Sequence, residues 1–351
     1  MSRFKGNKHK MGVQPLLVRI VADSDCSRLL TQTPGGAGIW DGIRFTTAPV
    51  HECDYLVMLN NRKLDPVASR CPPQNVWAIM QEPYLAGLYD WLIEDHEPYA
   101  RVYTHIPPST EPRYIASQPA VPWHVGLSYD ELIAAAIPRK CAGVSWVASN
   151  LTFLPGHRLR AALRRTLQSP QAPPVDLFGR GIRWVPRKWD VLAPYRYSLA
   201  IENSSGPDLW TEKIADCFLS WTVPLYYGCT NLERYFPEES FIRVNAADPV
   251  SVADRIRELL ARDEWERRLP ALEAARRLVL EKYQIFPFLA DAIRNDRQNG
   301  GPKAEIVIPG YRARRWKHRA RYIRRTCCAG DAADLGRVLL NKLKYLWWLG
   351  V

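Results

Sequence analysis

Uninterrupted apolar runs recur along the first third of the chain at intervals of roughly 20 to 40 residues. Most of them end in polar or loop-forming residues. Runs without alternation are typical of strands that are buried on both faces of a parallel sheet. We expect such strands at residues 16–21, 54–60, 75–80 and 101–104, with a short helix at 27–30. The pattern predicts repeated β-α units and a mostly parallel sheet.

A second set of units follows residues 119–138, which we interpret as a crossover between two domains. Pro270 lies inside the last helical pattern, where we expect the helix to bend or restart. The two halves therefore predict an α/β fold with two Rossmann-like domains that face each other across a cleft. In this second half we expect strands at 143–148, 175–179, 199–201 and 223–227, and helices at 157–168, 188–193, from 211, at 250–261 and at 264–286.

The length and charge of the chain divide it further. Its 351 residues are enough for two domains with separate cores, which we place at 1–138 and 139–302. Residues 303–351 carry 12 Lys and Arg against 3 Asp and Glu, so this basic tail holds +9 of the net charge of +12. The body is therefore almost neutral. Thirteen Trp suit either a sugar-handling surface or an aromatic core.

Two features bear on the compartment. The apolar run at 16–22 is short and contains Arg19, so we expect neither a signal peptide nor a membrane span there. The eight cysteines form no Cys-x-x-Cys motif. We interpret them as reduced thiols of a cytoplasmic protein and expect no zinc site.

The stretch 195–244 has the most informative pattern. The apolar run at 199–201 ends abruptly in loop formers at 202–208, and Thr211 then opens a helix. A second buried strand follows at 223–227. A polar loop between a buried strand and a helix N-terminus is where α/β proteins bind anionic ligands, so we expect such a ligand here.

The same stretch carries motifs in a characteristic order: IENS at 201–204, TEKI at 211–214, TVPLYYG at 222–228, YFP at 235–237 and SFI at 240–242. The match extends backwards through 194–197, 178–179, 156–160 and 149–150, and it is thinner in the N-terminal half, at 38–40, 81–83 and 119–124. Together they resemble glycosyltransferase family 10, the α-1,3/1,4-fucosyltransferases, in its bacterial type. The resemblance covers most of residues 16–290. It implies the two-domain glycosyltransferase-B architecture, GDP-fucose as donor, an oligosaccharide acceptor and inversion at the anomeric carbon, without a metal or other cofactor.

Two cations are expected at the departing diphosphate. Lys213 lies in the first turn of its helix, where a lysine is mildly unfavourable and a bound anion would offset the mismatch. The family's diphosphate arginine is followed by apolar residues three and seven positions later. Leu163 and Leu167 stand at those offsets from Arg160. Arg158 is the rival, and a solvated basic helix face is the alternative for both arginines.

Other donor contacts follow from the resemblance. Glu212 matches the carboxylate that binds the ribose, although an acidic residue also suits a helix first turn. Asn203 would bind the donor from the loop after its strand. Leu209 stands where the family often has Tyr, and Trp210 is expected to compensate for the missing hydroxyl. This departure bears mainly on the identity of the donor sugar.

The catalytic base is expected in the N-terminal domain. Glu82 follows a strand end, and the resemblance places the family's base near it. A carboxylate needs burial to raise its pKa for this role. His124 is the alternative base, and structural roles remain open for both residues. Asp23 and Asp25 form an Asp-x-Asp motif, but they lie far from the donor motifs, so we do not expect a metal there.

The basic tail interleaves arginines with aromatic residues at 311–325, and an apolar, Trp-containing cluster follows at 339–349. Binding to an anionic membrane surface accounts for both features. Packing on the protein body is the second interpretation, and a nucleic acid is not expected as a partner because it leaves the apolar cluster unexplained.

The sequence thus predicts a cytoplasmic fucosyltransferase, peripheral on the inner face of the membrane, that acts on a cell-surface glycan or a lipid-linked precursor. Two alternatives stay open: a related transferase that uses another GDP-sugar, and a non-catalytic module that binds a nucleotide sugar or a glycan. The sequence leaves the acceptor, the linkage and the oligomeric state undetermined.

Overall fold

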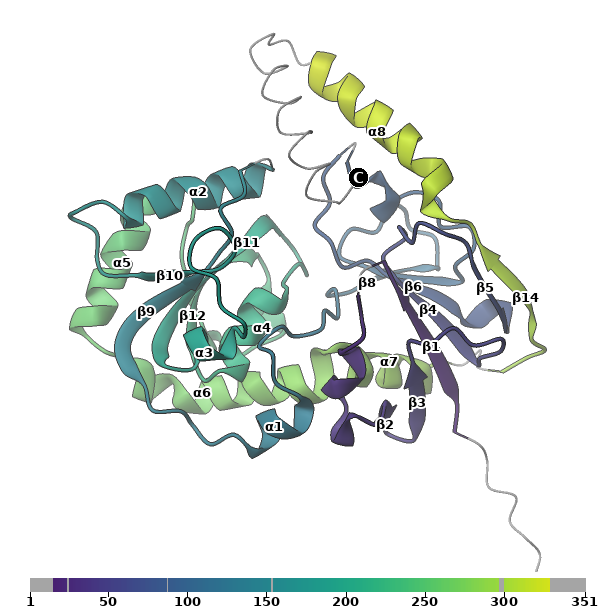
Figure 1. The fold of residues 1–351 in the computed structure, drawn as a ribbon, viewed down its shortest axis with the longest axis horizontal. Coiled ribbons are helices and arrows are strands. Elements are labelled where there is room, and N and C mark those ends of the chain that lie inside the picture. Colours follow the sequence, from purple (N-terminus) through teal and green to yellow (C-terminus); the bar gives the residue numbers. More distant parts are fainter. Residues whose placement is uncertain (1–14, 24, 87, 153, 297–299, 329–351) are drawn as a thin grey trace, which may run out of the picture.

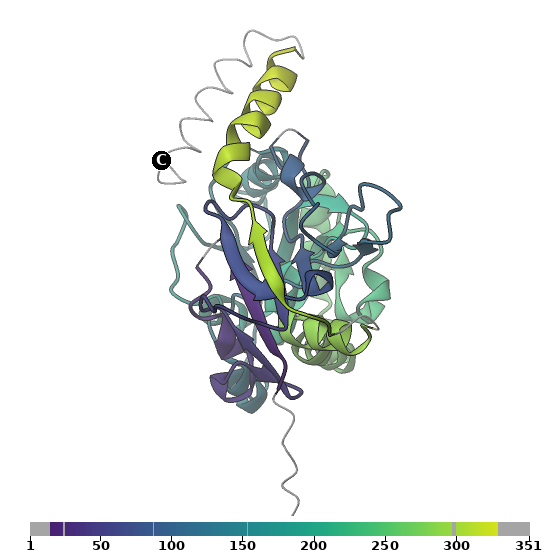
Figure 2. The ribbon, with the colours of Figure 1, turned by 90° about the vertical axis from the view of Figure 1, so that its right-hand side faces the viewer.

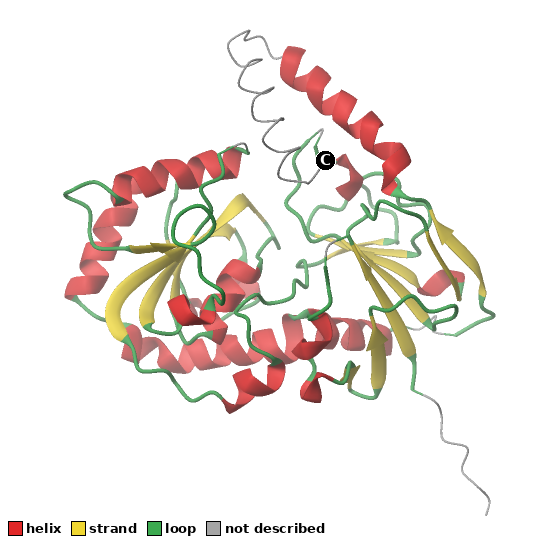
Figure 3. Ribbon diagram, viewed as in Figure 1, coloured by secondary structure: helices red, strands yellow, loops and turns green. Residues whose placement is uncertain are grey.

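The chain folds into two α/β domains, each built on its own sheet with helices packed against it (Figures 1 and 3). The structure is a computed structural model, and it describes residues 15–328 apart from 24, 87, 153 and 297–299. The two sheets and their largely parallel pairing confirm the predicted α/β fold with two Rossmann-like domains.

The N-terminal sheet has the strand order β2-β3-β1-β4-β6-β7-β8. Its pairs are parallel except for β2 with β3. The predicted helix at 27–30 is instead a short 3₁₀ turn at Leu29–Gln32. The strands are β1 (Leu17–Ala22), β2 (Ile39–Trp40), β3 (Ile43–Thr46), β4 (Tyr55–Leu59), β6 (Val76–Ile79), β7 (Arg101–Thr104) and β8 (Tyr114–Ala116).

The C-terminal sheet has the order β10-β9-β11-β12-β13, and all of its pairs are parallel. Its strands are β9 (Cys141–Val147), β10 (Asp176–Phe178), β11 (Tyr195–Gly206), β12 (Val223–Cys229) and β13 (Ile242–Arg243). The helices up to this domain's end are α1 (Tyr129–Ala134), α2 (Pro155–Leu167), α3 (Trp189–Leu192), α4 (Glu212–Leu219), α5 (Pro249–Ala261) and α6 (Trp265–Leu278).

The order of the strands determines where each sheet can form a ligand-binding crevice. In the C-terminal sheet the chain passes from β9 outward to β10 and then returns to β11 on the other side of β9. In the N-terminal sheet, β1 likewise lies between β3 and β4. Such reversals open a crevice at the carboxyl ends of the strands. Both crevices line one cleft between the domains, at residues 22–23, 59–60, 147–149 and 202–204.

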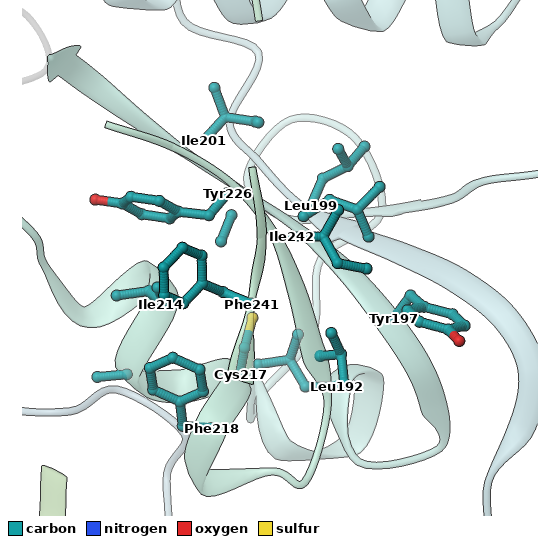
Figure 4. Close-up of a cluster of buried hydrophobic side chains, with 14 of the residues drawn as sticks. Leu192, Tyr197, Leu199, Ile201, Ile214, Cys217, Phe218, Tyr226, Phe241 and Ile242 are labelled. Atoms are coloured by element: carbon teal, nitrogen blue, oxygen red, sulfur yellow. The ribbon is translucent and has the colours of Figure 1, made fainter. Parts of the chain in front are cut away.

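The donor-side crevice stands on a well-packed apolar core. Helix α4 buries an almost continuous apolar face against β11 and β12, because its residues repeat at helical spacing. This packing holds the N-terminus of α4 close to the end of β11. Figure 4 shows this cluster, including Leu199 and Ile201 of β11, Ile214, Cys217 and Phe218 of α4, and Tyr226 of β12.

The expected break at Pro270 is wrong. Helix α6 runs through Pro270, which is only its sixth residue, so the missing N–H removes a single bond near the helix start. The interruption comes later, in a π-helical turn at Val279–Tyr283. Gln284 then has extended backbone and its side chain accepts a bond from the backbone N–H of Phe286, at the start of α7 (Ile285–Arg294).

The C-terminal domain was predicted to extend to residue 302, but the last helix before that boundary packs on the N-terminal domain. Helix α7 contributes Phe286 and Leu289 to the core beneath the N-terminal sheet, next to Phe45 of β3. In Figure 1, α6 and α7 follow one another along one side of the molecule from the C-terminal to the N-terminal domain. The chain therefore crosses between the domains twice, near 119–125 and near 284, because the apolar face of α7 is buried on the first sheet.

The described part of the predicted tail also packs on the N-terminal domain. Strand β14 (Ala304–Ile308) pairs antiparallel with β5 (Val67–Cys71) and leads into α8 (Tyr311–Cys328) (Figure 2). Arg314 and Arg321 of α8 form ion pairs with Asp95 and Asp90 at 3.2 and 2.8 Å. The apolar cluster at 339–349 lies outside the described residues. None of the described helices combines the length and the apolarity needed to cross a bilayer.

Candidate functional site

The cleft between the two domains encloses about 1070 Å³. It is lined from the donor side by the ends of β9 and β11 and by the first turns of α2 and α4, and from the acceptor side by the ends of β1, β4 and β6. Five predicted site residues of the donor and acceptor halves line it together: Glu82, Arg160, Asn203, Glu212 and Lys213. His124 lines it as well.

A buried carboxylate organises the donor wall. Glu202, at 2% exposure, accepts hydrogen bonds from the backbone N–H of Thr211 at 2.9 Å and from its hydroxyl at 2.7 Å. The ammonium of Lys213 lies 2.9 Å from the same carboxylate. Thr211 is also the N-cap of α4, since its hydroxyl accepts a bond from the backbone N–H of Lys213. Glu202 therefore ties the end of β11 to the start of α4.

This network corrects our interpretation of Lys213. Its unfavourable place at a helix N-terminus is offset within the protein, by Glu202 and by Glu212, whose carboxylate oxygen lies 3.4 Å from its ammonium. Burial alone would lower the pKa of Lys213, but these two carboxylates outweigh it and raise the pKa above its usual value. Lys213 is thus held as a cation that faces the cleft before any ligand binds.

Arg160 and Arg158 lie in the same helix but have different surroundings. Arg160 is 8% exposed and lines the cleft, and its Nε has no hydrogen-bond partner. Burial lowers the pKa of Arg160, although Glu202 and Glu212 oppose this, and the guanidinium stays charged. Arg158 is exposed and does not line the cleft. A buried cation with an unsatisfied donor is the better candidate for an anion contact.

Glu212 occupies the first position of α4 and faces the cleft. Its Oε1 lies 3.4 Å from the ammonium of Lys213 and 3.9 Å from that of Lys188. Burial on its own would raise the pKa of Glu212, but Lys213 and Lys188 outweigh it, so the net shift is strongly downward. Glu212 is therefore ionised and can act only as a hydrogen-bond acceptor.

Asn203 lines the cleft, at a point where α2 approaches the end of β11 very closely. A Cβ on Gly156, at the start of α2, would lie 1.9 Å from the backbone oxygen of Asn203. Only glycine permits this approach. Asn203 lines the cleft, and its side-chain Oδ1 is buried without a hydrogen-bond partner.

The acceptor wall presents Glu82 after the end of β6. Burial raises the pKa of Glu82, more than the nearby guanidinium of Arg62 lowers it, and Asp23 raises it further. Asp23 forms an ion pair with Arg62, and Asp25 accepts hydrogen bonds from Ser27. Among the described residues, no three His, Cys, Asp or Glu side chains gather in a metal-binding arrangement.

A comparison with protein families identifies the family that the donor wall matches. Residues 137–268, which contain the whole donor wall, match the model of "Glycosyltransferase family 10 (fucosyltransferase) C-term". The chain carries a glycosyltransferase family 10 domain. This agrees with the resemblance that the motifs of the donor wall indicated.

Curated relatives match the family 10 part of the chain. The 3-galactosyl-N-acetylglucosaminide 4-alpha-L-fucosyltransferase of Pan troglodytes is 35% identical over 123 residues, 33% of this chain and 32% of the relative. Alpha-(1,3)-fucosyltransferase 4 of Mus musculus is 30% identical over 211 residues, 54% of this chain and 43% of the relative. The matches therefore span between about a third and a half of these relatives' length.

A comparison with solved structures matches an alpha1,3-fucosyltransferase with GDP-fucose. It covers 78% of this chain and 85% of its own chain, with 18% sequence identity and a TM-score of 0.46.

One predicted donor contact in the family 10 domain is not supported by the structure. Trp210 is 1% exposed and packs edge-on against Tyr235, Phe236 and Tyr283 in the core, and it does not line the cleft. It cannot replace a hydroxyl in the site. Leu209 does line the cleft, so the family's frequent Tyr is replaced there by an apolar side chain.

Three polar residues of the donor wall were not predicted from the sequence: Glu202, Lys188 and Asp216. Glu202 is the first charged residue after the apolar run at 199–201, which was a usable signal. Asp216 interrupts the apolar face of α4 and is 1% exposed, and a charge in such a pattern needs a buried partner. Nothing in the pattern around Lys188 pointed to that partner.

Proposed function

We propose that this protein is an inverting fucosyltransferase that moves fucose from GDP-fucose to a hydroxyl of a glycan acceptor. One observation supports the proposal most strongly: candidate site residues from both domains line the same cleft. The donor wall of the family 10 domain offers Arg160, Lys213 and Glu212, and the facing wall offers Glu82 with a raised pKa.

The donor wall suits a nucleoside diphosphate. As the sugar departs, negative charge develops on the β-phosphate and must be stabilised. Arg160 and Lys213 are cations at the cleft surface, and the first N–H groups of α4 add the positive end of a helix. Because the guanidinium of Arg160 lines the cleft, it can donate to a phosphate oxygen.

The remaining donor contacts suit a ribose. Glu212 is ionised, and the ion pairs that it forms with Lys213 and Lys188 both use Oε1. A carboxylate held in this way can accept bonds from the two vicinal hydroxyls of the ribose. Asn203, which lines the cleft near the end of β11, supplies a further contact.

Glu82 suits the base that takes the proton of the acceptor hydroxyl. At an ordinary pKa a carboxylate is a weak base near neutral pH, and the upward shift at Glu82 strengthens it. The sugar passes through an oxocarbenium-like state, as in glycoside hydrolysis, while the hydroxyl attacks from the face opposite the diphosphate. Inversion follows because the base and the leaving group lie on opposite walls.

A related transferase with another GDP-sugar is a second candidate, because Leu209 offers the donor an apolar contact where the family often has a hydroxyl. A panel of GDP- and UDP-sugars, with nucleotide release and calorimetric binding measured on the intact chain, separates the candidates. Release from GDP-fucose supports the proposal. Release from another GDP-sugar alone supports the second candidate. Binding of GDP without turnover on any glycan offered supports a non-catalytic binding module.

We also propose that the enzyme works in the cytoplasm, at the inner membrane surface. Helix α8 exposes 72% of Trp316 beside Lys317, a pairing suited to an anionic bilayer surface. Co-sedimentation with vesicles rich in anionic lipid tests this. The full chain should pellet with them at low salt, and a chain ending at residue 328 should pellet less. Equal pelleting of both, or no pelleting of the full chain, contradicts a membrane role for the last residues.

A further inference from the structure

A second lysine, Lys188, forms an ion pair with Glu212, the carboxylate proposed to bind the ribose. Lys188 precedes α3 and lines the cleft, and its ammonium lies 2.8 Å from Oδ2 of Asp216 and 3.9 Å from Oε1 of Glu212. Glu212 and Asp216 are four residues apart on α4, so they share one face of the helix. Lys188 therefore bridges two carboxylates that would otherwise repel each other.

Asp216 fixes Lys188 in place. It is 1% exposed, and its two oxygens serve different partners, because Oδ2 pairs with Lys188 and Oδ1 accepts the backbone N–H of His124 at 2.8 Å. Burial would lower the pKa of Lys188, but Asp216 and Glu212 outweigh it and raise the pKa. Lys188 thus remains a cation with little freedom to turn toward another group.

We infer that Lys188 is a positioning residue for nucleoside recognition: held by Asp216, it orients the Glu212 carboxylate toward the ribose hydroxyls of the donor. The inference rests on the proposed function, since it takes Glu212 as the ribose contact. Because Asp216 also holds the backbone of His124, the ribose subsite is fastened to the first crossover between the domains. The rival role for Lys188 is direct contact with the diphosphate.

Two nucleotides separate these roles. GDP and 2′-deoxy-GDP differ by one ribose hydroxyl, so the ratio of their dissociation constants reports the ribose contact alone. In the unmodified protein we expect 2′-deoxy-GDP to bind about tenfold or more weakly, the effect of one hydrogen bond to a charged group. The Lys188→Met variant should bind GDP more weakly and lower this ratio toward one. The Glu212→Ala variant should do the same, and adding Lys188→Met to it should change the ratio no further.

The outcomes are distinct. If Lys188→Met weakens both nucleotides equally and leaves the ratio unchanged, the inference is wrong and Lys188 acts on the diphosphate or only on the fold. If the unmodified protein binds neither nucleotide, the proposed function itself fails. Because Lys188→Met leaves Asp216 buried without its cation, the double variant Lys188→Met with Asp216→Asn serves as the folding control. It removes both charges and should keep the lowered ratio at an almost unchanged Tm.

Discussion

Glu212 and Glu82 lie on opposite walls of one cleft. Their surroundings shift the pKa values of the two carboxyl groups in opposite directions. On the donor wall, Lys213 and Lys188 lower the pKa of Glu212 despite its burial. On the acceptor wall, burial raises the pKa of Glu82 because Arg62 offsets it only in part and is itself paired with Asp23. One residue type therefore serves as a fixed acceptor on one wall and as a candidate base on the other, according to the cations beside it.

The largest effect should follow from Glu82→Gln, which removes the base but keeps the shape of the side chain. We expect kcat to fall by about 10²–10⁴-fold, the usual range for a general base, while the Kd of GDP stays unchanged. Steady-state kinetics and calorimetry on the same preparation measure both. Glu111→Gln, an exposed position of the same domain, is the matched control. If His124→Gln loses turnover and Glu82→Gln does not, His124 is the base.

Substitutions on the donor wall should instead raise the Kd of GDP. Arg160→Ala should weaken GDP binding by about 10–150-fold, the range for hydrogen bonds to charged groups. Arg158→Ala, two residues away on the exposed side of α2, should change the Kd of GDP by less than about threefold. Calorimetric titration of the two variants side by side checks this. Equal losses in both would mean that the diphosphate reaches across the outer face of α2.

The close approach of α2 to Asn203 of β11 predicts a smaller effect. Gly156→Ala should force α2 away from Asn203 and lower the free energy of unfolding by about 1–3 kcal/mol, as overpacking does, together with GDP affinity. Gly206→Ala is the matched control, because a Cβ there meets nothing within 4 Å. Denaturant unfolding and GDP titration measure the two effects. An unchanged Gly156→Ala variant would show that this approach is not needed.

The smallest expected effect is the dependence of kcat/KM and Tm on the protonation of Glu82. Since only ionised Glu82 accepts a proton, kcat/KM should rise with pH through a pKa above the ordinary glutamate value, and it should be lost as the pH falls through that value. A raised pKa in the folded state also means that the charge at Glu82 destabilises the protein at neutral pH. Glu82→Gln should therefore have an equal or slightly higher Tm at pH 7, and a clear fall in Tm would contradict the shift.

The main elements of the donor wall could be predicted from the sequence because their signals are local. The strand and the helix of 195–244 follow from apolar runs and first-turn residues within one stretch, although β11 continues to Gly206 through residues predicted as a loop. The family resemblance supplied Arg160, Glu212 and Lys213. Their place around one cleft then follows from parallel strands that share their carboxyl ends.

The sequence could not predict the contacts that depend on packing between distant segments. Glu202 pairs with Lys213 only because α4 folds back onto the end of β11, and Lys188 meets Asp216 across 28 residues of chain. Helix α7 follows the second domain in sequence but fits the core of the first. Trp210 was assigned to the site from its neighbours in sequence, although its indole fits an aromatic core.

The most direct test of the account is transfer itself, followed by NMR on the intact chain with GDP-β-L-fucose and a set of glycan acceptors. The account predicts α-linked fucose on an acceptor hydroxyl, one GDP released for each bond formed, and loss of both signals in Glu82→Gln although GDP still binds. A correctly folded protein that binds GDP but transfers no fucose to any of these acceptors, or a product with retained β configuration, would contradict it.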